Sequence, residues 1–130
     1  MSSISTIFII DDDPVFQAIL NMSLSQIDHP KDVKMFSNGK DAITALHGRA
    51  CCHRILVFLD LHMPIMDGWE FLSQLQQHPF CKDVRVIITS SSTLKEDKVR
   101  AQQFPQVWSF QEKPLNLSLI KEMVGEHFKY

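Results

Sequence analysis

The chain has 130 residues, of which 45% are hydrophobic and 22% are charged, so it can form the core of one domain and is not disordered by composition. Its formal net charge is −2, which argues against a general binder of nucleic acids or anionic membranes, because such proteins are usually basic. No apolar run approaches the roughly 20 residues of a membrane span, the first residues lack a signal-peptide pattern, and three cysteines show no disulfide spacing; we therefore expect a cytoplasmic protein.

Apolar runs that predict buried strands alternate with amphipathic segments that predict helices. The first run ends in acidic residues, and Asp13-Pro14 then begins a helix, because Asp is a favourable N-cap and Pro fits the first helical position. The expected elements of this half are a strand at 6–11, a helix at 14–27, a strand at 33–36 and a helix at 39–47.

The second half repeats this alternation. A buried run again ends at an aspartate, Asp60, and two pairs with capping-box spacing, Asp67 with Glu70 and Thr93 with Glu96, predict the starts of two helices. The expected elements are strands at 54–60, 83–89 and 107–111 and helices at 67–78, 93–104 and 116–128. Five strands in strict alternation with five helices predict an α/β fold with a parallel sheet and right-handed crossovers. No linker or repeat interrupts the pattern, so residues 1–130 are expected to form a single domain.

Residues that can bind a phosphoryl group follow the ends of the predicted strands. Ligands of open parallel sheets bind beyond the carboxyl ends of the strands. Asp11 and Asp12 follow the first strand and Asp60 the third, so the three carboxylates would converge if these two strands are neighbours. Three carboxylates within a few ångströms would repel one another. Mg²⁺, a hard cation with oxygen ligands, relieves such repulsion. Lys113, together with Ser90 or Thr89, would complete a site for a phosphoryl group.

Together these motifs resemble the receiver domain of bacterial two-component response regulators, over nearly the whole chain. The resemblance depends on four segments: 9–14, 59–68, the Ser/Thr cluster 89–92, and Lys113-Pro114. It implies a doubly wound, flavodoxin-like (βα)5 fold with strand order 2-1-3-4-5; this order comes from the resemblance and not from the residues.

The resemblance also implies roles for the acidic residues and the lysine. Asp60 would accept a phosphoryl group from a phosphohistidine. Asp11 and Asp12 would hold Mg²⁺ together with Asp60 and the backbone carbonyl of His62, with Asp12 the more direct ligand of the acidic pair. Lys113 would bind the phosphoryl group and precede a cis peptide bond to the next proline.

A hydroxyl and an aromatic ring act as the switch in the family. Ser90 is expected to be the hydroxyl because it lies thirty residues after Asp60, although Thr89 remains an alternative. Phe110 takes the aromatic position. Phosphorylation would draw in the Ser90 hydroxyl, move Phe110 and change the surface of the fourth helix, the fifth strand and the fifth helix.

We therefore expect a stand-alone receiver that signals and is not an enzyme acting on a separate substrate. Its partners would be a sensor histidine kinase or a histidine phosphotransfer protein and an unidentified downstream protein, with no direct binding of nucleic acid or membrane. Two alternatives stay open. Asp11 and Asp13 also fit the DxDx[TV] motif of haloacid-dehalogenase-like phosphohydrolases, in which Asp11 would be the nucleophile. The chain could also bind partners without being phosphorylated.

Overall fold

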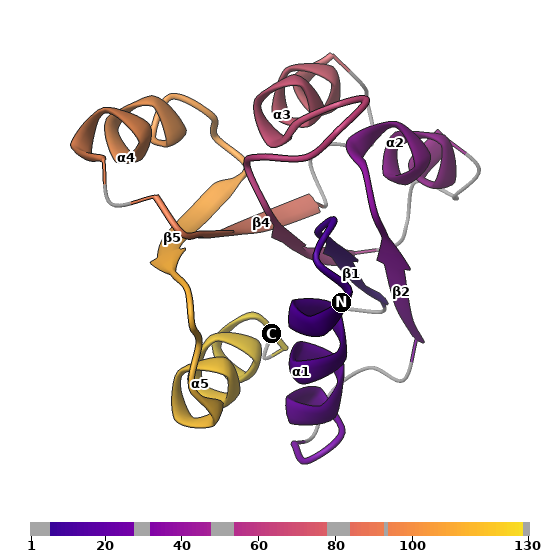
Figure 1. Ribbon diagram of the computed structural model, residues 1–130, viewed down its shortest axis with the longest axis vertical. Coiled ribbons are helices and arrows are strands. Elements are labelled where there is room, and N and C mark those ends of the chain that lie inside the picture. Colours follow the sequence, from indigo (N-terminus) through magenta and orange to yellow (C-terminus); the bar gives the residue numbers. More distant parts are fainter. Residues whose placement is uncertain (1–5, 28–31, 48–53, 78–83, 93, 129–130) are drawn as a thin grey trace.

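The protein forms a five-stranded parallel sheet with helices on both faces (Figure 1). The structure is a computed structural model, which describes residues 6–27, 32–47, 54–77, 84–92 and 94–128. The strands lie in the order β2-β1-β3-β4-β5, which confirms the predicted doubly wound fold. The elements are β1 (Thr6–Ile10), α1 (Pro14–Leu24), β2 (Asp32–Phe36), α2 (Gly39–His47), β3 (Ile55–Leu59), α3 (Gly68–Gln76), β4 (Val84–Ser90), α4 (Lys95–Ala101), β5 (Val107–Glu112) and α5 (Leu117–Phe128).

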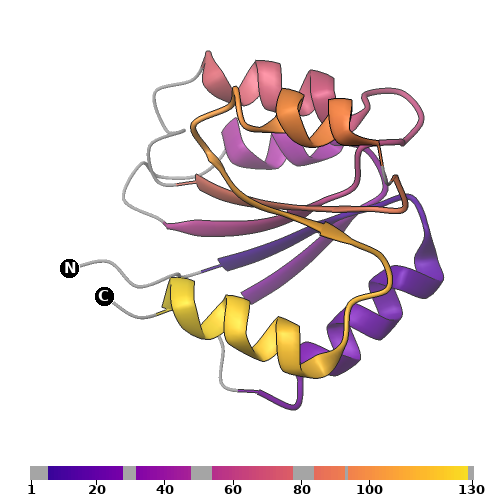
Figure 2. The same cartoon turned by 90° about the vertical axis from the view of Figure 1, so that its left-hand side faces the viewer.

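The sheet is the middle of three layers: α1 and α5 cover one face, and α2, α3 and α4 cover the other (Figure 2). Side chains of β1 alternate between two cores: Phe8 and Ile10 pack under α2 and α3, whereas Ile7 and Ile9 pack under α1 and α5. Strands buried on both faces need continuous apolar runs, which is what the sequence of β1 and β3 shows. No helix in the described part of the chain has the length and apolarity to cross a bilayer.

Two predicted helix starts are confirmed. The Asp13 carboxylate accepts hydrogen bonds from the backbone N–H groups of Val15 and Phe16, with Pro14 in the first turn of α1. Asp67 and Glu70 form the predicted reciprocal capping box at the start of α3.

The predicted start of the fourth helix is wrong. α4 begins at Lys95 with Leu94 at the N-cap and without a side-chain cap, and Thr93 lies outside the described residues. Ser92 organises this start instead: its hydroxyl donates to the Asp97 carboxylate at 2.7 Å and accepts from the Leu94 N–H at 3.2 Å. The serine side chain thus gives the backbone N–H of Leu94 a hydrogen-bond partner outside the helix, which favours a start of α4 after Leu94.

Helices α1 and α4 also end about three residues before the predicted positions. The N–H of Ile27 donates to the carbonyl of Leu24, and that of Phe104 to the carbonyl of Ala101, both at 3.1 Å. These bonds span three residues, so the predicted last turns are present as tighter 3₁₀-type turns and not as α-helix.

A β-bulge interrupts the edge strand β5. Val107 pairs with Val86, but Ser109 pairs with the next residue, Ile87, so Trp108 is one extra residue in β5. The bulge places both Val107 and Phe110 against the core under α4, although they are three residues apart. Simple alternation along 107–111 would have placed them on opposite faces.

Candidate functional site at the carboxyl ends of the strands

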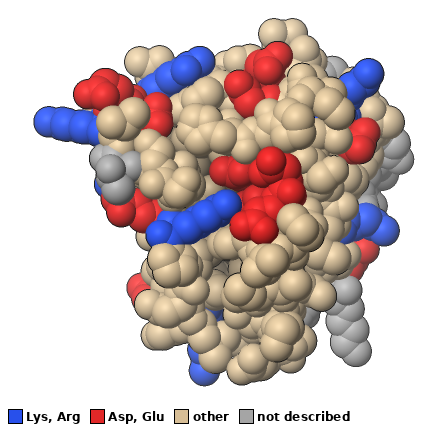
Figure 3. Space-filling view, in the orientation of Figure 1, with Lys and Arg blue, Asp and Glu red and all other residues tan. Residues whose placement is uncertain are grey.

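Parallel pairing places the predicted acidic residues side by side. Ile10 pairs with Leu59, so Asp11 and Asp60 follow as neighbours on the face covered by α1 and α5. The Asp60 N–H donates to the Ile10 carbonyl at 2.9 Å and fixes this register beyond the strand end. One carboxylate oxygen from each of Asp11, Asp12 and Asp60 lies within 4.8 Å of the others. On the face of the molecule seen in Figure 3, acidic side chains gather beside a basic one near the centre.

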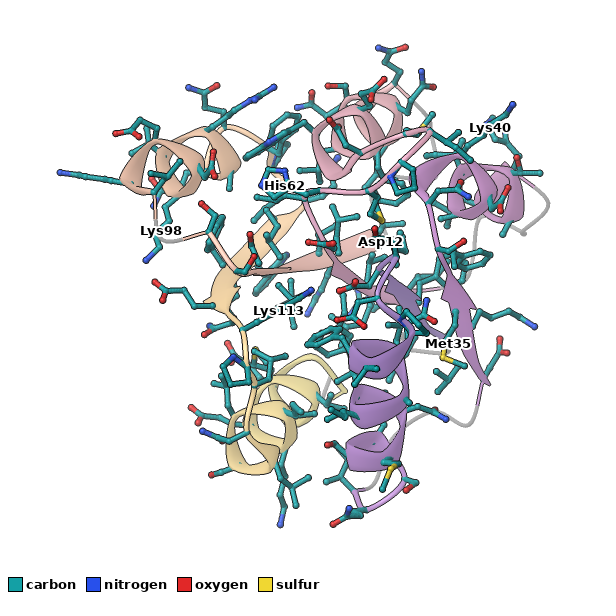
Figure 4. The ribbon with its side chains drawn as sticks, in the orientation of Figure 1. Asp12, Met35, Lys40, His62, Lys98 and Lys113 are labelled. Atoms are coloured by element: carbon teal, nitrogen blue, oxygen red, sulfur yellow. The ribbon has the colours of Figure 1, made fainter. Side chains whose placement is uncertain are left out.

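Lys113 reaches this group from the end of β5. Its Nζ lies 2.7 Å from Asp11 Oδ2 and 3.9 Å from Asp60 Oδ1, and 4.3 Å from the centre of the Phe16 ring. Its backbone N–H donates to the Ser90 carbonyl at 2.8 Å, and its peptide bond to the following proline is cis, as expected. Asp12 follows β1 and Lys113 follows β5, so the two side chains reach the same end of the sheet from opposite sides of its centre (Figure 4).

The charges at this site do not balance among the described residues. Three carboxylates face one ammonium group, which leaves two negative charges uncompensated when all are ionised. Burial and then the Asp11 charge raise the pKa of Asp60 to about 6, although Lys113 and a backbone hydrogen bond from His62 act in the opposite direction. Burial likewise raises the pKa of Asp11.

These residues fit a hard divalent cation. Carboxylate oxygens are the ligands that Mg²⁺ prefers, and one or two carboxylates suffice because the ion keeps several waters. Asp11 already accepts from the Asp13 N–H through Oδ1 and pairs with Lys113 through Oδ2. Asp12 is exposed, and no hydrogen bond to its side chain is found among the described residues, so Asp12 and Asp60 are the carboxylates best placed for direct contact with an ion.

The loop after Asp60 packs against the backbone of the site. A Cβ added to Gly68 would lie 2.4 Å from the Asp60 carbonyl oxygen and 2.8 Å from the Leu61 Cα, so only glycine fits there. Within the same loop Ile65 has φ 70°, which is unfavourable for a β-branched residue. The His62 side chain is exposed, and its backbone N–H, not its imidazole, contacts Asp60.

The two candidate hydroxyls lie on opposite faces of β4. The strand continues to Ser90, one residue beyond the predicted end, so Thr89 and Ser90 are both strand residues and both fully buried. Ser90 Oγ accepts from the Ser92 N–H at 3.0 Å. Ser90 follows the alternation of Val86 and Ile88 towards α4, where Phe110 is also partly buried. Thr89 follows Ile87 towards α1 and α5.

Sequence reasoning missed Gln17. Its side-chain amide donates to the backbone carbonyls of Asp11, at 2.8 Å, and Phe36, at 2.9 Å. It therefore ties the end of β1 to the end of β2 and holds the backbone that carries the acidic residues. Gln17 is a half-buried polar residue one turn into a helix, and nothing in the sequence indicates this role.

The chain is similar to known proteins in sequence and in fold. A family model described as the response regulator receiver domain matches residues 7–125. A probable cyclic di-GMP phosphodiesterase of Vibrio cholerae is 30% identical over 95% of this chain, which spans only 26% of that protein. A two-component response regulator from Cytophaga hutchinsonii has a TM-score of 0.81 at 23% identity, over 95% of this chain and 96% of that one.

A yeast structure shares the fold as well. The receiver domain of Ssk1 from Saccharomyces cerevisiae, crystallised with the histidine phosphotransfer protein Ypd1, has a TM-score of 0.79 at 23% identity, over 98% of this chain and 91% of that one. These comparisons give no support to the phosphohydrolase alternative. The Asp13 carboxylate, which that mechanism would use as acid and base, caps α1.

Proposed function

The chain belongs to the response regulator receiver domain family of two-component signalling, and we propose that residues 1–130 form one receiver whose Asp60 accepts a phosphoryl group. The observation that carries this proposal is the arrangement around Asp60: a buried carboxylate with a pKa raised to about 6, flanked by two further acids and by Lys113. A buried acidic group of this kind is costly unless a ligand compensates it.

The chemistry is a phosphoryl transfer to a carboxylate. An Asp60 oxygen attacks the phosphorus of a phosphohistidine whose ring is protonated on its other nitrogen. The P–N bond breaks as the P–O bond forms, and the histidine leaves as a neutral imidazole that keeps this proton. Lys113, 3.9 Å from Asp60, can leave Asp11 and pair with a phosphoryl oxygen. Asp11, Asp12, Asp60 and the His62 carbonyl would hold Mg²⁺, which, when bound, neutralises charge on the transferred group.

Ser90 and Phe110 are the proposed switch. Both lie on the face covered by α4, and the Ser90 backbone is joined to Lys113. Movement of Ser90 towards a phosphoryl group would alter the packing of Phe110, whose ring lies 5.9 Å from Lys98 Nζ on α4. The changed surface of α4, β5 and α5 would bind a downstream protein.

The proposed phosphoryl donor is a sensor histidine kinase or a histidine phosphotransfer protein. Val15, Ile19 and Met22 are exposed on α1, and they begin directly after the acidic residues. Such apolar exposure beside a reactive site fits a partner that must bring a phosphohistidine to Asp60. The yeast neighbour was crystallised with a histidine phosphotransfer protein.

Mass spectrometry after incubation with acetyl phosphate and Mg²⁺ tests the proposal. We expect one added phosphoryl group on Asp60 that is sensitive to hydroxylamine and absent from Asp60→Asn. Modification of Asp11 would instead favour the phosphohydrolase, and no modification would indicate a module that works without phosphorylation.

A further inference from the structure

Thr89 occupies the strand position next to the phosphoacceptor. Leu59 pairs with Ile88 across β3 and β4, so the next residues on each strand, Asp60 and Thr89, are neighbours. Phe58 and Ile87, one pair earlier, both pack under α1 and α5. Because side chains two residues apart share a face, Asp60 and Thr89 both point towards α1 and α5. Ser90 points to the other side.

The Thr89 hydroxyl is buried without a protein partner. Thr89 has 0% exposure, and its Oγ1 makes no hydrogen bond with any described residue. Most buried hydroxyls have a partner, because leaving one unpaired costs the free energy of its lost hydration. Valine has the same shape and would avoid this cost. A threonine that is unpaired in this state therefore points to a partner in another state.

Lys113 extends from the end of β4 to the end of β1. Its backbone N–H bonds to the Ser90 carbonyl at the end of β4, and its Nζ lies beside Asp11 at the end of β1. The path between these points crosses the sheet end at which Thr89 and Asp60 lie. A group attached to Asp60 under the lysine would therefore arrive next to the unpaired hydroxyl.

We propose that Thr89 is a second hydroxyl donor to the phosphoryl site, in which its Oγ1–H bonds to the acyl phosphate formed on Asp60. This proposal rests on the proposed function. Thr89 would hold the phosphorylated group from the side of α1 and α5, whereas Ser90 responds to it from the side of α4. Thr89 therefore affects how tightly the phosphoryl group is held and not how the change is passed to Phe110.

Binding of beryllofluoride, a phosphoryl mimic, in the presence of Mg²⁺ tests the proposal. Thr89→Val removes the hydroxyl at constant shape, and Thr89→Ser keeps it. We expect the valine variant to bind beryllofluoride about 10- to 100-fold more weakly, the range for loss of a hydrogen bond to a charged group. The serine variant should stay within about threefold of the parent, a far smaller loss than that of a charged hydrogen bond.

Urea unfolding without ligand provides the second measurement. Because the hydroxyl is unpaired in this state, Thr89→Val should unfold at an unchanged or higher urea concentration. Equal beryllofluoride affinity of the parent and Thr89→Val, or a ligand-free valine variant that is clearly less stable than the parent, would overturn the role of Thr89 and leave the proposed function intact. A parent that binds no beryllofluoride would instead refute the proposed function, and this inference with it.

Discussion

Replacement of Asp60 by asparagine should stabilise the protein in the absence of Mg²⁺. The carboxylate is buried beside two other acids, and its pKa is raised from 3.8 to about 6. A shift of about two pKa units corresponds to about 3 kcal/mol of unfavourable free energy for the ionised form. Lys113 is already included in this shift, and screening by solvent lowers the free energy further, so we expect a gain of about 1–3 kcal/mol in the free energy of unfolding at pH 7.5.

The gain should depend on pH in a defined direction. Since the pKa of Asp60 is higher in the folded state than in the unfolded state, its contribution to parent stability is fully present below about pH 4 and is lost as pH rises through about 6. The asparagine variant lacks this titration. The difference in stability between variant and parent should therefore be small at pH 4 and reach its full value above pH 7.

Urea unfolding at several pH values measures this difference. With a slope of about 2 kcal/mol per molar urea, the middle of the usual range, the midpoint at pH 7.5 should rise by about 0.5–1.5 M. Asp13→Asn is the matched control, because it removes the same charge from an exposed cap and asparagine still caps the helix. Mg²⁺ at 100 times its dissociation constant should add about 2.7 kcal/mol to the parent and less to Asp60→Asn. A pH-independent loss of stability in Asp60→Asn would refute the repulsion argument.

Three further changes test other parts of the site. Asp12→Ala should weaken Mg²⁺ binding at least tenfold in a calorimetric titration, whereas Asp13→Asn should bind as the parent does, since its carboxylate serves as a cap. Gly68→Ala should lower the free energy of unfolding by about 1–3 kcal/mol or more, because its Cβ would meet the Asp60 backbone; an unchanged urea midpoint would show that the loop can shift. Ser90→Ala should still be phosphorylated but lose most of the fluorescence change of Trp108, and a full response would assign the switch elsewhere.

The sheet and the acidic cluster were predictable because both depend on short-range patterns. β1 and β3 are buried at every residue and, after Thr6, consist of apolar residues, as burial on both faces requires, and each strand is followed by an aspartate. Parallel pairing brings Asp11 and Asp60 together once β1 and β3 are neighbours in the sheet. The strand order, by contrast, came from the resemblance to receivers, since alternation of elements does not specify it.

The features that were not predicted depend on contacts between distant segments. The bulge at Trp108 is set by how β5 pairs with β4, and nothing in the residues 107–111 marks it. Ile65 has its positive φ in a tight turn, in which the Met66 N–H donates to the Pro64 carbonyl at 2.8 Å, and the Met66 carbonyl accepts from the distant Gly39 N–H at 3.0 Å. A β-branched residue would not adopt this φ by local preference. Gln17 gains its role only because the ends of β1 and β2 lie beside α1.

The register of β4 determines which layer each of the two adjacent hydroxyls at its end faces. Side chains alternate along a strand, so Thr89 and Ser90 must face different layers, and a shift of one residue would exchange them. Thr89 shares the layer in which charge accumulates at Asp60, and Ser90 shares the layer of Phe110 and α4. Loss of the first hydroxyl should therefore change the affinity for a phosphoryl mimic, whereas loss of the second should change the response of β5 and α4 to it. An exchange of these two effects would place the register of β4 one residue away from the observed pairing.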